Sequence, residues 1–180
     1  MNKKTKFLDP KDVDEAVAEA ALAARSGRID AAIVGGVAMV VYGSDRLTKD
    51  VDVACRDEYL PGMREVKPLT FGGASTLTPK GHPLDVIVRN DDYRDLYVAA
   101  IEDARDEGLA LPVVSPEYLA AMKMVAGRDK DEIDLKTLVR LGVLDLDRTR
   151  TIVRTHLGRY AVKVFDSLCA EVEWMRSQEH

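Results

Sequence analysis

The segment 33–53 constrains this chain more than any other part of the sequence. It contains an apolar run that is interrupted by Gly35 and Gly36, and then a second apolar run that holds Asp50 and Asp52. The alternation of polar and apolar residues around the aspartates predicts a strand that points both side chains to one face. Two carboxylates about 6.6 Å apart along a strand can bind one divalent cation or a close pair of cations.

Magnesium suits this pair, because it binds few carboxylates and completes its octahedral shell with water and substrate phosphate. The alternative is an amphipathic edge strand whose aspartates lie in water. Aspartate is depleted in strands, so two on one face of a valine-rich strand call for a reason. The spacing alone leaves both interpretations open.

The two glycines lie between a short apolar segment, 31–34, and a segment that can form a helix, 37–42. Such a turn lets a ligand approach the backbone closely, and the helix that follows turns its free amides toward an anion. The segment is neither a P-loop nor a G-x-G-x-x-G motif. In the alternative interpretation, the glycines only permit a sharp strand-to-helix turn.

Together, the glycine turn and the paired aspartates resemble the signature of the DNA polymerase beta-like nucleotidyltransferase superfamily. Arg46 and Thr48 lie in the intervening loop, and the resulting Arg-x-Thr-x-Asp-x-Asp arrangement is similar to that of the minimal bacterial AbiEii-toxin-like branch. The resemblance implies that the aspartates bind the metals that bridge a nucleoside triphosphate, with Gly35, Gly36, Arg46 and Thr48 near the nucleotide. Gly36 stands where the family often has serine, which removes one hydroxyl contact to phosphate.

A third carboxylate is expected on a neighbouring strand, and Asp85 is the candidate. It interrupts the run of Leu, Val and Ile over 84–88, and ionised carboxylates are rarely buried without a partner. The resemblance implies that Asp85 completes the metal site and activates the attacking hydroxyl. A solvated position at the end of a strand is the alternative.

The segment 117–135 resembles later motifs of the AbiEii-like enzymes. On that basis Lys123 would contact the triphosphate, while Asp131 and Asp134 would support the active site. One straight helix would hold Lys123 and Asp134 about 16 Å apart, so they can share a site only if the chain folds back near Gly127. In the alternative, Lys123 extends from an apolar helix into water, and the two aspartates accept bonds from nearby arginines.

The rest of the chain alternates helical and strand patterns and then becomes purely helical. We expect a helix from 9 to 25, a short helix within 56–63, a loop with one strand over 62–80, a helix over 91–106 and a strand over 110–114. We then expect a helix over 116–124 with Ser115 as its cap, a helix from the capping Asp129 to Leu141, and a last helix with Phe165, Leu168, Val172 and Trp174.

This order predicts an α+β (α/β) fold, with a small mixed nucleotidyltransferase-type sheet flanked by helices. We expect residues 1–114 to form the catalytic core with its N-terminal helix. Residues 115–180 would form a helical region that completes the active-site cleft.

Composition favours an ordered protein, with 46% hydrophobic and 32% charged residues among 180. Cys55 and Cys169 suggest no disulfide framework. The lysine-rich N-terminus is not followed by an apolar signal segment, and the longest apolar run, 31–42, is too short for a membrane span. We therefore expect a cytoplasmic protein that makes no membrane contact.

Five cations and no acid lie between Arg148 and Lys163, although the net charge of the chain is −5. The other three are Arg150, Arg154 and Arg159. This strip could track RNA phosphates, since AbiEii-like enzymes are toxins or presumed toxins and some modify transfer RNA; a solvated helix face is the alternative. The resemblance also implies an antitoxin protein as a partner.

The sequence therefore predicts a magnesium-dependent nucleotidyltransferase. It would move a nucleoside monophosphate from a nucleoside triphosphate to an RNA end or a protein hydroxyl. The rival hypothesis is a protein of the same fold that binds nucleotide or a protein partner without turnover.

Overall fold

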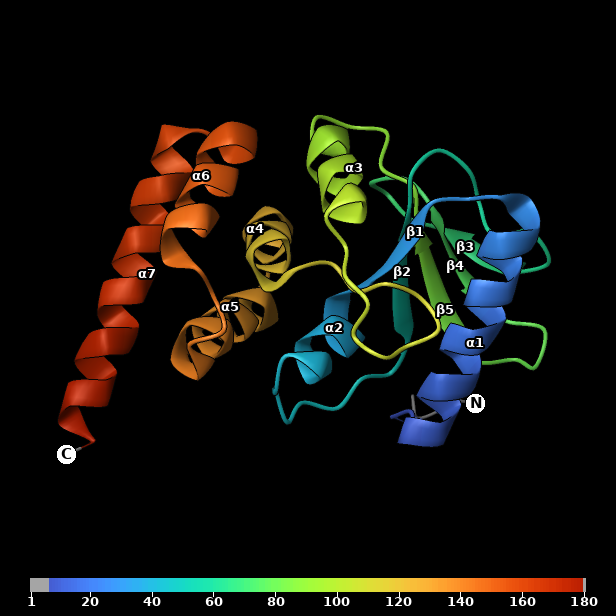
Figure 1. The fold of residues 1–180 in the computed structure, drawn as a ribbon, viewed down its shortest axis with the longest axis horizontal. Coiled ribbons are helices and arrows are strands. Elements are labelled where there is room, and N and C mark those ends of the chain that lie inside the picture. Colours follow the sequence, from blue (N-terminus) through green and yellow to red (C-terminus); the bar gives the residue numbers. More distant parts are fainter. Residues whose placement is uncertain (1–6, 180) are drawn as a thin grey trace.

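The computed structural model describes residues 7–179, which form a five-stranded sheet and seven helices (Figure 1). The strands are β1 (Ala31–Val34), β2 (Val51–Cys55), β3 (Arg64–Pro68), β4 (Ala74–Leu77) and β5 (Pro83–Ile87). The helices are α1 (Pro10–Gly27), α2 (Gly35–Val41), α3 (Arg94–Glu102), α4 (Pro116–Ala126), α5 (Asp129–Leu141), α6 (Leu146–Leu157) and α7 (Arg159–Gln178). This mixed architecture confirms the predicted fold class.

The strand order in the sheet is β1-β2-β5-β4-β3. Strands β2 and β5 run parallel, and the other three neighbouring pairs are antiparallel. The central pair is therefore connected by a crossover that contains the β3–β4 hairpin. Its register places Asp52 directly opposite Asp85.

Helix α1 and helices α3 and α4 lie on opposite sides of the sheet (Figure 1). Asp9 caps α1, because its carboxylate accepts a hydrogen bond from the Asp12 amide at 2.8 Å. The buried face of α1 consists mostly of alanine, including Ala16, Ala20 and Ala24. These small side chains let the helix pack closely against β2.

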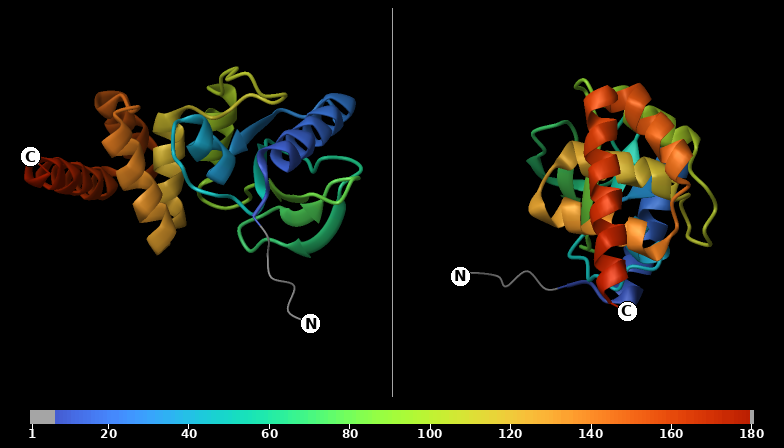
Figure 2. Two further views of the ribbon diagram at one scale, coloured as in Figure 1. Left: turned by 90° about the horizontal axis from the view of Figure 1, so that it is seen from below. Right: turned by 90° about the vertical axis from the view of Figure 1, so that its left-hand side faces the viewer.

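The helices after residue 115 form a separate layer of the molecule, with α4 against the sheet side and α7 outermost (Figures 1 and 2). Helix α4 ends at Ala126, where Gly127 adopts a left-handed conformation with φ of +60°. The chain reverses there and enters α5, as the geometry of Lys123 and Asp134 requires. Within residues 7–179, every helix is too short or too polar to span a membrane.

Two predictions about the segment after β2 are wrong. Residues 56–63 form bends and turns instead of a short helix, because Pro61 and a positive φ of +78° at Gly62 interrupt any helical path. Residues 62–80 contain two strands instead of one. Strand β3 escaped prediction because all of its residues are exposed at the sheet edge, so it carries no apolar alternation.

Other element boundaries also differ from expectation. Helix α3 covers only 94–102 of the expected 91–106, since Asp91 pairs with Arg89 before the helix starts. The expected strand over 110–114 is reduced to bridges that Val113 makes with Ile33 and Arg105.

The predicted helix caps in the second half are also partly wrong. Arg128, and not Asp129, occupies the cap position of α5. Ser115 stands at the cap of α4, but its hydroxyl donates to Asp103 at 2.6 Å and leaves the helix amides free.

Candidate active site

The glycine turn at the start of α2 is shaped around the Asp52 carboxylate. Gly35 has a φ of +63°, and a Cβ atom there would lie 1.9 Å from Oδ2 of Asp52. A Cβ atom at Gly36 would lie 2.7 Å from the Thr48 hydroxyl, and the Gly36 amide donates to Asp52 at 3.4 Å. Both glycines are therefore needed for close approach of side chains to the backbone, which is more than a sharp turn requires.

Asp85 lies beside Asp52, on the adjacent parallel strand. The two residues are register partners, so their side chains share one face of the sheet. The Ser75 hydroxyl, from the next strand, donates to the Asp85 carboxylate at 2.6 Å. Asp85 is thus held in place by strand pairing on one side and by a hydrogen bond on the other.

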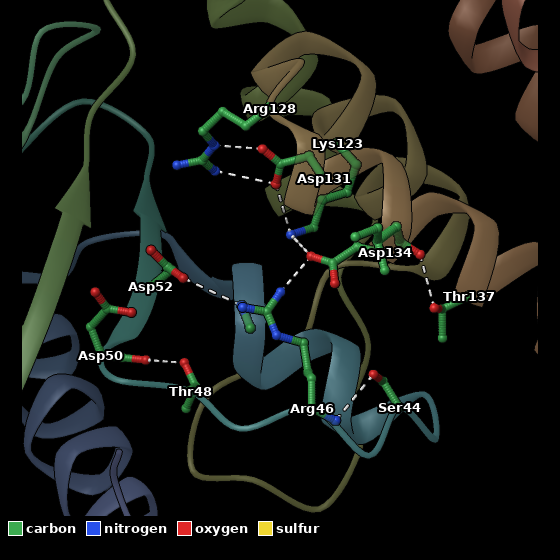
Figure 3. A network of polar contacts seen from close by, with 12 residues as sticks. Ser44, Arg46, Thr48, Asp50, Asp52, Lys123, Arg128, Asp131, Asp134 and Thr137 are labelled. Carbon is green, nitrogen blue, oxygen red and sulfur yellow. Dashed lines mark hydrogen bonds and ion pairs between the residues drawn. The ribbon is translucent and has the colours of Figure 1, made fainter. Parts of the chain in front are cut away.

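Asp50 immediately precedes β2 and lies next to Asp52 (Figure 3). The Thr48 hydroxyl donates to the main-chain oxygen of Asp50 at 2.7 Å, which fixes the backbone just before the strand. No cation of residues 7–179 forms an ion pair with Asp50, Asp52 or Asp85. The positive charges nearest to them, such as that of Lys123, act on these carboxylates only from beyond ion-pair distance.

The clustering of these acids perturbs their proton affinity. Burial raises the pKa of Asp52 to about 7, and the negative charges of Asp50 and Asp85 add to this rise. Burial also raises the pKa of Asp85, against the opposing effect of the Ser75 hydrogen bond. Such perturbed carboxylates in a cleft are typical of functional sites.

A network of ion pairs faces these acids from α4 and α5 (Figure 3). The Lys123 ammonium lies 2.5 Å from Oδ2 of Asp134 and 3.2 Å from Oδ1 of Asp131. Arg46 also pairs with Asp134, and Arg128 pairs with Asp131 at 2.5 Å. Lys123 is buried with its charge paired, so it does not extend into water.

Three cations share two carboxylates in this network, which leaves one net positive charge beside the acids of the sheet. Burial by itself raises the pKa of Asp131, but the hydrogen bond from Arg128 and the charge of Lys123 outweigh it and hold this pKa below its ordinary value. Asp131 therefore stays ionised at neutral pH. The network also ties the α4–α5 hairpin to the loop before β2.

One cleft of about 460 Å³ collects nearly all of the residues selected from the sequence. It is lined by Gly35, Gly36, Arg46, Thr48, Asp50, Asp52, Asp85, Lys123 and Asp131. Asp134 does not line the cleft, but it forms ion pairs with Arg46 and Lys123, which do. No three Asp, Glu, His or Cys side chains of residues 7–179 form a ready-made metal cluster.

The donor set nevertheless fits a divalent cation of the magnesium type. Asp50, Asp52 and Asp85 are oxygen donors. Burial raises the pKa of Asp52, and the charges of Asp50 and Asp85 raise it further, so a cation bound here would stabilise its ionised form. Magnesium needs only a few carboxylates and takes its remaining ligands from water and phosphate.

A second part of the cleft was not predicted from the sequence. Phe71, Arg89, Tyr93 and Tyr97 line it, and Ser75 holds Asp85 from the side. Arg89 could have been found from the strand pattern, because Asp85, Ile87 and Arg89 are two residues apart and share one face. Tyr93 and Tyr97 could have been found from their spacing of one helical turn. No comparable pattern in the sequence pointed to Ser75.

The basic strip of the second half is only partly available to a partner. Arg148 pairs with Asp103 and Glu117, and Arg150 pairs with Asp147 and Asp166. The remaining members, Arg154, Arg159 and Lys163, are exposed and form no ion pair within residues 7–179.

The fold is similar to that of a solved nucleotidyltransferase-like protein. A solved structure of an antigenic nucleotidyltransferase-like protein from Paracoccidioides brasiliensis matches 88% of this chain and 95% of its own, with 19% identity and a TM-score of 0.50. The solution structure of the antibiotic-resistance factor ANT(2'')-Ia matches 95% and 96%, with 15% identity and a TM-score of 0.49. No protein-family model and no curated protein sequence matches the chain. The first likeness and the sheet topology show that this chain has a nucleotidyltransferase fold.

Proposed function

We propose that the protein is a magnesium-dependent nucleotidyltransferase that moves a nucleoside monophosphate from a nucleoside triphosphate to an acceptor hydroxyl. One observation carries this proposal. Two carboxylates from parallel strands, Asp52 and Asp85, stand together with Asp50 at a glycine turn, and a cationic network faces them across the same cleft. A fold likeness alone would not support an activity.

The cationic side of the cleft supplies the binding site for the triphosphate. Lys123 and Arg128 line the cleft together with Lys130, at the junction of α4 and α5. Arg46 approaches from the loop before β2. Their charge would neutralise phosphate oxygens and hold the α-phosphate toward the carboxylates.

Asp50, Asp52 and Asp85 would hold magnesium, which stabilises charge on the attacking and leaving oxygens of phosphoryl transfer. The acids are pre-positioned by the protein for this role. The glycine turn surrounds Asp52, strand pairing sets Asp85, and Thr48 fixes the backbone at Asp50.

Asp85 is the proposed acceptor of the proton. The acceptor oxygen forms a bond to the α-phosphorus, the bond from that phosphorus to the bridging oxygen breaks, and pyrophosphate leaves. The hydroxyl proton passes to the Asp85 carboxylate. Burial raises the pKa of Asp85, so this carboxylate accepts a proton more readily than an ordinary aspartate does.

An RNA end is the acceptor that we place first. The exposed cations Arg154, Arg159 and Lys163 could contact the phosphates of a nucleic acid, and the sequence resemblance to AbiEii-like toxins points the same way. A toxin role with a neutralising antitoxin is part of this proposal. Growth of cells that express the chain, with and without its neighbouring gene product, would test it.

The activity is tested by incorporation of α-labelled nucleoside triphosphates into total RNA, protein or a pool of small hydroxyl compounds, with magnesium present. The proposal expects label in one pool, with pyrophosphate released in equal amount. Tight binding of nucleotide without incorporation into any pool would instead support a binding protein of this fold.

A further inference from the structure

One part of the cleft has a chemistry that phosphate transfer does not use. Six residues form it, and we call them the aromatic sector: Leu69, Phe71, Ile87, Arg89, Tyr93 and Tyr97. They come from the β3–β4 turn, from β5 and the loop that follows it, and from α3. Three of the six are aromatic, although aromatic residues make up only 6% of the chain.

Arg89 organises this sector. Its guanidinium carbon lies 4.9 Å from the centre of the Phe71 ring, 5.0 Å from that of Tyr97 and 5.5 Å from that of Tyr93. Its Nε donates to Oδ1 of Asp91 at 2.9 Å, and an Nη donates to Oδ2 at 2.5 Å. The side chain is only 7% exposed.

This arrangement holds the rings in fixed positions. Asp91 neutralises the arginine, and the cation then contacts three ring faces from a desolvated position, where such contacts are strongest. The aromatic walls are therefore preorganised, so a ligand would not bear the cost of ordering them.

The aromatic sector adjoins the carboxylates. Asp85, Ile87 and Arg89 lie two residues apart from one another on the same side of β5 and the segment that follows it. The first residue of the sector on this strand, Ile87, is therefore the next residue after Asp85 on that side. Burial raises the pKa of Tyr97, and the negative charge of Asp52 raises it further. Tyr97 therefore lies close enough to Asp52 to interact with its charge. The whole set lines one continuous cleft.

We infer that the aromatic sector binds the base of the nucleotide, by stacking against its rings. This inference rests on the proposed function, since it names where that same substrate places its base. A nucleoside triphosphate has an anionic end and a flat, largely apolar end, and the cleft has a cationic side and an aromatic part to match them. Stacking on aromatic side chains tolerates every base, because each base has a π-face.

Base selection by this sector is weak. The two donors of Arg89 that form its planar fork are both occupied by Asp91, so they do not read a base edge. Purines, with their larger rings, should bind more tightly than pyrimidines, and the difference between adenine and guanine should be small.

The test compares ATP with tripolyphosphate, which carries the charge but no base, in binding measurements at equal free magnesium. Wild-type protein should bind ATP more tightly. F71L and Y93L should each weaken ATP binding roughly tenfold, as expected for loss of a stacking contact, and leave the tripolyphosphate affinity unchanged. Y160L is the matched control, because Tyr160 is 80% exposed on α7, away from the cleft.

The outcomes separate this inference from the proposed function. If wild-type protein binds tripolyphosphate and ATP equally well, or if both F71L and Y93L keep the full preference for ATP, the aromatic sector does not bind the base. If the variants instead raise only the KM for the acceptor, the sector belongs to the acceptor and the inference is wrong. If neither ligand binds wild-type protein, the proposed function fails, and the inference fails with it. Circular dichroism and thermal melting of each variant exclude unfolding as the cause.

Discussion

Asp52 and Asp85 face each other as register partners on the only parallel strand pair of residues 7–179, so two acids that are 33 positions apart in sequence share one side of the sheet. The glycine turn surrounds Asp52, and Asp50 lies next to it. The resulting electrostatic repulsion is not relieved by any nearby ion pair. The properties of this acid cluster therefore determine how the protein responds to pH and to cations.

The stability of the metal-free protein should fall as pH rises. The pKa of Asp52 is about 7 in the folded protein, against an ordinary value of 3.8. Between these values Asp52 binds more protons in the folded state than in the unfolded state, so its contribution to folding stability is highest at low pH and decreases toward pH 7. D52N removes the titrating group and should flatten this dependence. One pKa unit corresponds to about 1.4 kcal/mol, so the pH-dependent part of the unfolding free energy should differ between the two proteins by a few kcal/mol.

Urea denaturation of wild-type protein and D52N in chelator, from about pH 5 to about pH 8, measures this effect. Only the difference between the two proteins is informative, because other groups titrate equally in both. Equal pH slopes would show that Asp52 has an ordinary pKa in the folded state.

Magnesium should raise the melting temperature of wild-type protein at pH 8, because a cation bound only by the folded state stabilises it by mass action. D50N and D52N should lose most of this shift. D14N is the matched control, since Asp14 is an exposed carboxylate on α1. A magnesium shift of the same size in D52N and D14N would argue against the proposed metal site.

Substitution of Gly35 tests the close approach of Asp52. G35A should destabilise the protein by about 1–3 kcal/mol or more, because the new Cβ meets the Asp52 carboxylate and the φ of +63° is strained for alanine. G81A separates these causes, since Gly81 has a φ of +94° with no heavy atom near its Cβ position. Equal losses in the two variants would mean that backbone strain, and not the carboxylate, explains the glycine.

Lys123 should be needed for triphosphate binding and less so for folding. In K123M, Asp134 keeps Arg46 and Asp131 keeps Arg128, so two cations still balance two acids. We expect at least a tenfold loss of tripolyphosphate affinity with a change in unfolding free energy within about 2 kcal/mol. Calorimetric titration and urea denaturation measure the two quantities, and unchanged affinity in K123M would exclude its contact with phosphate.

The sequence was most informative where local chemistry was unusual. The paired glycines before an Asp-x-Asp strand predicted the turn. Asp85 was predicted as a site residue because it is the one aspartate in an apolar run. The fold class and the reversal of the chain at Gly127 followed from the order of elements and from a helix-stop signal. All of these are local patterns of spacing and residue type.

What the sequence could not predict depends on long-range contacts. Strand β3 is stabilised by pairing with β4 while its side chains lie in solvent, so it shows no apolar pattern. The bond from Ser75 to Asp85 depends on strand register, and the position of Arg89 among three rings depends on how α3 packs against the sheet at β2. Arg148 and Arg150 belong to the basic strip that was identified in the sequence. In the fold, acids from other elements form ion pairs with both of them.

The most direct test of the account is nucleotidyl transfer by purified D52A, measured as pyrophosphate release together with labelled product, beside D14A and wild-type protein. The account predicts that D52A retains its fold and loses transfer, while D14A behaves as wild type. Transfer by D52A at the wild-type rate would contradict the assignment of these carboxylates as the active site.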